Sequence, residues 1–179
     1  MDGRAIQHVV PHRPPFVWVD RIIECEPGKR ARGIKLVSVN DPLVAPELTR
    51  TGKDAGDGGS GDVTGSFPRV LLVEAIAQVA AVALLPLVVD GGAAESTGAA
   101  GTTAGTTGGM TGRSSPVLPL FAGMEEVTFA RPVRAGDVVD IEVEVVQARR
   151  SAARVSGRCL VAGEVAAQGT FLFAFRRNG

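Results

Sequence analysis

The sequence has very little of the residue types that build disulfides, metal centres and most acid–base sites. Its 179 residues include two cysteines, two histidines and no tyrosine. Cys25 and Cys159 show no CxxC or Cys/His ligand spacing, which argues against a disulfide framework or a zinc site. We expect two reduced, buried thiols in a protein that uses no metal and no other cofactor.

Net charge is absent as well. The 19 Lys and Arg residues balance the 19 Asp and Glu residues, so the chain offers no electrostatic footprint for nucleic acid or an anionic membrane. We expect neither partner. The N-terminal segment through Pro15 is too polar and too rich in proline for the apolar centre of a signal peptide, so we expect no export and a cytoplasmic location.

Two stretches, residues 50–64 and 91–115, contain few large apolar side chains and are dominated by small residues, above all glycine. Such segments cannot bury enough apolar surface to offset the entropy of the chain. We therefore predict mobile insertions between ordered elements. The rest of residues 1–179 is long enough to form one domain with its own core.

Segments rich in β-branched residues on both sides of these insertions predict an antiparallel sheet. In the N-terminal part, strands at 16–25 and 30–38 flank a Glu-Pro-Gly-Lys turn, as expected for a hairpin. The C-terminal part shows partial alternation of apolar and polar residues between turn sequences, which predicts an antiparallel meander. Its four strands are expected at 120–129, 137–147, 152–161 and 165–175.

Residues 70–89 are apolar on nearly every face of a helix, so protein or lipid must enclose this helix. A run of about 20 residues also suits a bilayer. However, Glu74 would be costly in hydrocarbon, Pro86 interrupts the apolar run, and the predicted strands need an apolar body to cover. We predict an α+β fold in which an antiparallel sheet wraps a central helix at about 69–89, with no membrane span.

Glu74 and Gln78 are the polar residues of this helix before Pro86, and their i, i+4 spacing places them on one face, one turn apart. A carboxylate on so apolar a helix is paired, partly solvated at a cleft, or held protonated. We interpret Glu74 as a catalytic acid beside an apolar channel. The structural alternative is a buried carboxylate satisfied by backbone or by an arginine.

Four motifs of the chain resemble those of the hot-dog-fold 3-hydroxyacyl-acyl-carrier-protein dehydratases (FabZ-like enzymes) of fatty-acid and polyketide synthesis. They are PHRPPFVWVDR at 11–21, EPGKR at 26–30 with VNDP at 39–42, VLLVEAIAQ at 70–78, and FAGMEEVTFARPVRAGD at 121–137. In order and spacing they cover nearly the whole chain apart from the insertions. The resemblance implies a hot-dog fold and a dimer of such folds.

The resemblance also implies roles for single residues. In the family, each site lies at the subunit boundary and pairs a histidine of one protomer with a helix carboxylate of the other. Glu74 matches that carboxylate, which assists loss of the C3 hydroxyl while the histidine takes the C2 proton of a thioester borne by acyl carrier protein. Gly123 matches the glycine whose N–H stabilises the thioester oxygen, with a turn or bulge as the alternative. Supporting positions are Gln78, His12 and Phe121.

The chain departs from the family in lacking its catalytic histidine. Family members carry a GHFPxxPxMPG segment before the helix, which has no histidine here. The preferred alignment matches Pro68 to a proline of that segment and puts Glu47 at the histidine, whereas the other alignment puts Ser66 there. A serine hydroxyl is a poor base unaided, and a second carboxylate would interact unfavourably with Glu74.

The two histidines of the chain lie near its N-terminus. His12 belongs to the PHR motif, which does not supply the base in the family, so we expect a structural histidine that caps local backbone. His8 is expected at the surface. Trp18 is expected to be a core or dimer-packing aromatic residue.

We therefore expect one half of a heterodimeric dehydratase, weak or inactive alone, which forms a trans-2-enoyl thioester when a homologous subunit supplies the histidine. The alternatives are a non-catalytic hot-dog subunit that binds acyl chains or carrier protein, and an acyl-thioester hydrolase that activates water with a carboxylate. The sequence does not give the acyl chain length. It also does not decide whether the partner is a homologous subunit or a second copy of this chain.

Overall fold

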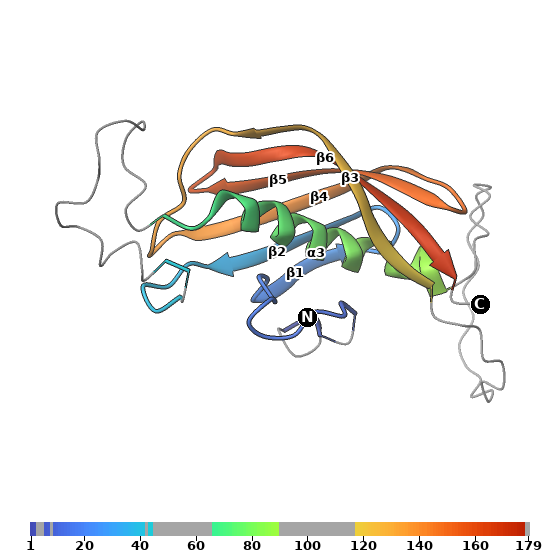
Figure 1. The fold of residues 1–179 in the computed structure, drawn as a ribbon, viewed down its shortest axis with the longest axis horizontal. Coiled ribbons are helices and arrows are strands. Elements are labelled where there is room, and N and C mark those ends of the chain that lie inside the picture. The colour runs from blue at the N-terminus through green and yellow to red at the C-terminus, as the bar shows by residue number, and fades with distance from the viewer. Residues whose placement is uncertain (3–5, 8, 42, 45–65, 90–116, 178–179) are drawn as a thin grey trace.

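The computed structural model describes residues 1–2, 6–7, 9–41, 43–44, 66–89 and 117–177. Both predicted insertions, together with Glu47 and His8, lie outside these residues. A long helix lies across one face of a six-stranded antiparallel sheet (Figure 1). Its elements are β1 (Arg21–Glu26), β2 (Arg30–Leu36), α3 (Arg69–Val89), β3 (Val117–Phe129), β4 (Val138–Ala148), β5 (Ala152–Val161) and β6 (Glu164–Arg177).

The strand order, β1-β2-β4-β5-β6-β3, differs from the predicted meander. The prediction is correct for β4, β5 and β6 but wrong for β3, which pairs with β6 at the far edge while β4 pairs with β2. The segment between β3 and β4 includes the buried Val133, whose carbonyl accepts a hydrogen bond of 2.7 Å from the N–H of Phe67. Alternation of side chains indicates which face of a strand is buried, but it does not identify the neighbouring strand.

The first strand begins at Arg21, five residues later than predicted from residue 16. In the segment before it, the main-chain groups of Phe16 and Trp18 bond to the side chain of Gln78 instead of to a neighbouring strand. Trp18 and Val19 of this segment are buried, whereas Phe16 is exposed, so its strand-like composition reflects in part the contact with α3. The second strand ends at Leu36, two residues earlier than predicted.

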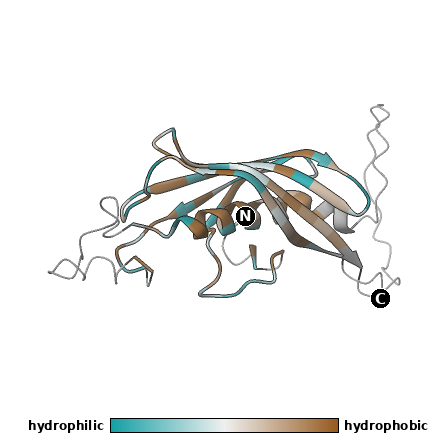
Figure 2. Cartoon of the chain, turned by 45° about the horizontal axis from the view of Figure 1, so that its top comes forward, coloured by the Kyte–Doolittle hydropathy of each residue, from teal (hydrophilic) through white to brown (hydrophobic). Residues whose placement is uncertain are grey.

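The core lies between α3 and the sheet, as the apolar composition of the helix predicts. Figure 2 shows apolar residues along the helix and a mixture of polar and apolar residues along the strands. The buried helix residues are Leu72, Ala75, Ile76, Ala77, Gln78, Val79, Ala80, Val82, Ala83 and Leu84. None of the helices in the described part of the chain combines the length and hydropathy that a bilayer crossing requires.

Two glycines of the sheet allow the helix to approach closely. A Cβ atom at Gly33 on β2 would lie 2.8 Å from Cγ2 of Val79, and one at Gly157 on β5 would overlap the side chain of Ile76. Both contacts are shorter than packed carbon atoms tolerate. The short distance between α3 and the sheet therefore requires residues without a Cβ atom at positions 33 and 157.

The two thiols differ. Cys159 is buried, its Sγ lies 3.8 Å from the carbonyl oxygen of Leu72, and burial raises the pKa of its thiol to about 12. Cys25 is exposed, so the prediction of two buried thiols is wrong for this residue. It lies on the edge strand β1, where even an apolar side chain, that of Ile23, is exposed.

Replacing Gly157 with alanine is expected to lower the free energy of unfolding by about 1–3 kcal/mol, because the added methyl group overpacks the interface with α3. Gly123→Ala is the matched control, since its Cβ would meet nothing closer than Leu172 Cδ1 at 3.9 Å. Urea denaturation of both variants measures the difference. Equal midpoints would contradict the close-approach argument.

Candidate active site

The side chain of Gln78 is the centre of a hydrogen-bonded cluster on α3. Its Nε2 donates to Oε1 of Glu74 at 2.9 Å and to the carbonyl oxygen of Phe16 at 2.8 Å, and its Oε1 accepts the N–H of Trp18 at 2.9 Å. Only 1% of the residue is exposed, so these bonds replace those with water. The predicted polar spot, with both residues on one face one turn apart, is confirmed.

His12 joins this cluster from the PHR motif. Its Nε2 lies 3.2 Å from Oε1 of Glu74, within the distance of an ion pair or a hydrogen bond. Its Nδ1 is buried and has no hydrogen-bond partner among the described residues. The predicted role as a cap of local backbone is therefore wrong. Reaching from the N-terminal segment to the helix carboxylate, His12 makes a contact that the sequence did not indicate.

Arg13 shapes the loop that carries His12. Its Nη1 donates to three successive carbonyl oxygens, those of Val10, Pro11 and His12, at 3.2, 3.3 and 2.8 Å. Nη1 has two N–H groups, so at least one of them is shared between neighbouring carbonyl oxygens. These bonds depend on the path of the loop, so the sequence gives no local signal for them.

The surroundings of Glu74 decide between the alternatives left open by the sequence. About a third of its side chain is exposed (37%), and its described partners are Gln78 and His12. It is thus paired and partly solvated, and neither backbone nor an arginine satisfies it among the residues that the structure describes. Both partners contact Oε1, whereas Oε2 has no described partner. One carboxylate oxygen is anchored and the other is available.

Two aromatic rings pack together just before the first residue of α3. Trp18 is buried and meets the ring of Phe67 edge to face, with centroids 5.7 Å apart and planes at 72°. Trp18 is therefore a core aromatic residue, the first of the two predicted roles. Ser66, next to Phe67, forms an isolated antiparallel β-bridge through its backbone with Arg134, in the segment between β3 and β4.

Gly123 and Phe121 lie on β3, the edge strand next to β6. The register between β3 and β6 shifts between these residues, so the bulge predicted as the alternative for Gly123 is present. Phe121 is 47% exposed, and its ring lies 5.9 Å from that of Phe173. No hydrogen bond or ion pair links either residue to Glu74 within the described part of the chain. Among the described residues, hydrogen bonds and ion pairs thus link Glu74 to Gln78 and His12 but not to Gly123 or Phe121.

A buried cation, not predicted from the sequence, ties two of the family-like motifs together. Lys35 is buried on β2, with its Nζ 3.6 Å from Oδ1 of Asp20 and 3.8 Å from Oδ2 of Asp41. Asp41, in the VNDP motif, is buried as well and accepts the N–H of Leu43. These pairs position the chain where it leads toward Glu47. Alternation along β2 places Lys35 on the same face as the buried Ala31 and Gly33.

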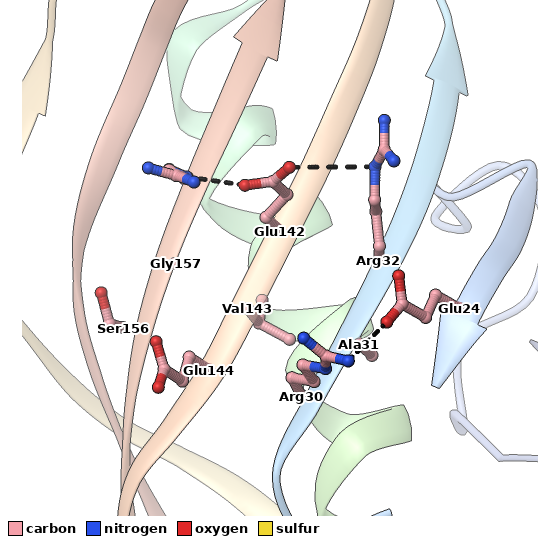
Figure 3. Close-up of a pocket in the computed structure, with 10 residues that line it drawn as sticks. Glu24, Arg30, Ala31, Arg32, Glu142, Val143, Glu144, Ser156 and Gly157 are labelled. Atoms are coloured by element: carbon pink, nitrogen blue, oxygen red, sulfur yellow. Dashed lines mark hydrogen bonds and ion pairs between the residues drawn. The ribbon is translucent and has the colours of Figure 1, made fainter. Parts of the chain in front are cut away.

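The pocket drawn in Figure 3 lies elsewhere, on the face of the sheet opposite α3. Its charged side chains pair across neighbouring strands: Arg30 with Glu24 at 3.0 Å, and Arg158 with Glu142 at 2.7 Å. Such pairs are typical of a solvated sheet face and contribute little individually. No group of three potential metal ligands forms among the described residues of the chain.

Comparison with known proteins gives a consistent result. No family model matches the chain. A protein of Thermomicrobium roseum named 3-hydroxyacyl-(acyl-carrier-protein) dehydratase FabZ is 39% identical over 178 residues, covering 97% of this chain and 92% of that protein. A protein of the same name from Caldicellulosiruptor bescii is 36% identical over 171 residues, covering 96% of each.

Solved structures share the fold at low sequence identity. The dehydratase heterocomplex ApeI:P of Xenorhabdus doucetiae matches with a TM-score of 0.61 at 16% identity, over 97% of this chain and 91% of that one. A hypothetical thioesterase of Streptococcus pneumoniae with coenzyme A matches with a TM-score of 0.55 at 11% identity, over 88% and 86%. Together with the antiparallel sheet around α3, these matches confirm the hot-dog fold.

Gln78→Leu is expected to lower the free energy of unfolding by about 2–4 kcal/mol, because it leaves the buried N–H of Trp18 without a partner and removes the bond to the carbonyl of Phe16. Trp18 is the single tryptophan of the chain, so its fluorescence reports the same change as a red shift. Gln168→Leu, at an exposed position of β6, is the control. Comparable loss of stability in both variants would refute the anchoring role of Gln78.

Proposed function

Because the chain belongs to the family of FabZ-type 3-hydroxyacyl-acyl-carrier-protein dehydratases, we propose that it is a dehydratase subunit of fatty-acid or polyketide synthesis. Its substrate would be a 3-hydroxyacyl thioester of acyl carrier protein and its product the trans-2-enoyl thioester. The observation that carries this proposal is the carboxylate of Glu74. Gln78 and His12 hold one of its oxygens, and the other is available for chemistry.

The proposed reaction needs an acid and a base on opposite ends of the same two carbons. A base takes the proton from C2, the electrons of that bond form the C2–C3 double bond, and the C3 hydroxyl leaves as water with a proton from Glu74. The N–H of Gly123 would stabilise negative charge on the thioester oxygen. Atoms and charge balance when the proton taken up by the base is returned to Glu74, which restores both groups for the next turnover.

The arrangement of His12 favours a base from another chain. Its Nε2 faces Glu74 and its Nδ1 is buried, so neither nitrogen is placed to take a C2 proton while Glu74 acts on C3. The other histidine of the sequence, His8, lies outside the described residues and outside the family's histidine segment. We infer a homologous hot-dog subunit with that histidine as the partner, with a second copy of this chain as the alternative.

The edge strand β3 offers a place for such a partner. Its stretch from Leu120 to Met124 carries exposed apolar side chains, with Phe121 47% and Met124 55% exposed, and a strand edge of this kind pairs readily with another chain. At the opposite edge, the N–H of Ile22 on β1 already bonds to the carbonyl of Met1. The dehydratase heterocomplex ApeI:P, which shares the fold, supports a two-chain assembly.

The activity is tested by combining this chain with a hot-dog protein that retains the GHFP segment and following the acyl-carrier substrate by mass spectrometry. Glu74→Gln is expected to slow dehydration by at least about a hundredfold, since it removes the acid. Glu144→Gln, on the solvated face of β4, is the matched control and should leave the rate unchanged.

Two outcomes would refute this proposal, and each would support a different function. Full turnover by the Glu74→Gln complex, with none when this chain is omitted, would show a non-catalytic subunit. Release of free carrier thiol by this chain alone would show an acyl-thioester hydrolase.

Association is tested separately by sedimentation velocity. Met124→Lys is expected to weaken the complex, because it places a charge in the exposed apolar stretch of β3 from Leu120 to Met124. Val146→Lys adds the same charge at a residue of β4 that is 61% exposed, and should leave association unchanged. If both variants or neither dissociate, the partner does not bind along β3.

A further inference from the structure

We propose that His12 is a positioning residue: its Nε2–H holds Oε1 of Glu74, so that Oε2 is the oxygen that exchanges a proton with substrate. The catalytic part of this inference rests on the proposed function, but the state of His12 does not. The inference is drawn from the contact of 3.2 Å between the two side chains and from the burial of the other ring nitrogen.

The buried nitrogen of His12 selects one tautomer. A neutral imidazole carries one proton, on either Nδ1 or Nε2. A proton on Nδ1 would be a buried donor without an acceptor among the described residues, and a buried donor left unpaired is costly. With the proton on Nε2, the donor lies 3.2 Å from a carboxylate oxygen, and a hydrogen bond to a charged acceptor is the stronger kind.

The second donor to Glu74 strengthens the assignment. Gln78 Nε2 also donates to Oε1, at 2.9 Å, and it is itself held by the backbone of Phe16 and Trp18. An oxygen that accepts from two donors is a poor place for the acidic proton, so the proton of the acid form belongs on Oε2. The two anchors therefore select which oxygen of Glu74 reacts and restrict its rotamer.

The loop that carries His12 is built to hold it. Arg13 gathers the carbonyls of Val10, Pro11 and His12, and Gln78 fixes the chain again at Phe16. The histidine thus sits between two anchored points. In the PHR motif, Arg13 holds the backbone of the loop and His12 orients the carboxylate of Glu74.

The tautomer is tested on the isolated chain by long-range ¹H–¹⁵N NMR of the histidine rings at a pH where imidazole is neutral. A His8→Gln variant assigns the two ring systems. We expect His12 to populate the Nε2–H form and its signals to shift in Glu74→Gln. A proton on Nδ1, or signals that Glu74→Gln does not move, would overturn the proposal.

The positioning role is tested in the reconstituted complex with two amide variants. The amide nitrogen of glutamine reaches the place of Nε2, whereas that of asparagine reaches the place of Nδ1. We expect His12→Gln to keep kcat near that of the wild type and His12→Asn to lose about ten- to a hundredfold, the cost of misplacing a catalytic group. Equal loss in both would show that His12 transfers protons, and equal retention that it has no role.

The two experiments separate the inference from the function on which it builds. If the wild-type complex shows no dehydration, the proposed function fails, and the NMR experiment still decides the state of His12. Denaturation midpoints of both amide variants verify that a loss of rate is not a loss of fold. If either variant fails to fold, the wild-type spectrum alone confirms or rejects the tautomer.

Discussion

The buried amide of Gln78 is the interaction on which the candidate site depends. A polar side chain enclosed by apolar residues must bond to something, and here it bonds to two backbone groups of the N-terminal segment and to Glu74. These bonds draw the segment from Phe16 to Trp18 across α3, in place of the longer β1 strand that its composition predicts. Removing the amide would thus disturb the acid, the loop and the core aromatic residue together.

Much of the fold could be predicted from composition and spacing. The apolar run at 70–89 indicated a wrapped helix, and the i, i+4 spacing of Glu74 and Gln78 placed them on one face. Both follow from local periodicity. The position of β3 at the far edge could not be predicted in this way, because the strand that lies beside it is decided by contacts distant in sequence.

The site was harder to predict than the fold. The resemblance identified Glu74, but the contact of His12 joins residues 62 positions apart along the chain and has no periodic signature. The same holds for Lys35, whose two aspartates come from separate motifs. His12, Asp20 and Asp41 all belong to motifs that the sequence shows. The residues that they contact, however, depend on the paths of the loops.

The two bulges of β3 have a consequence for any strand that adds to this edge. The register shifts between Phe121 and Gly123 and again between Glu125 and Thr128, where Glu126 adopts a left-handed backbone with φ of 53°. A regular ladder of hydrogen bonds cannot continue through such a break. A strand added to this edge would therefore form a regular ladder only in the segments that the two bulges separate, which restricts the registers in which it can pair.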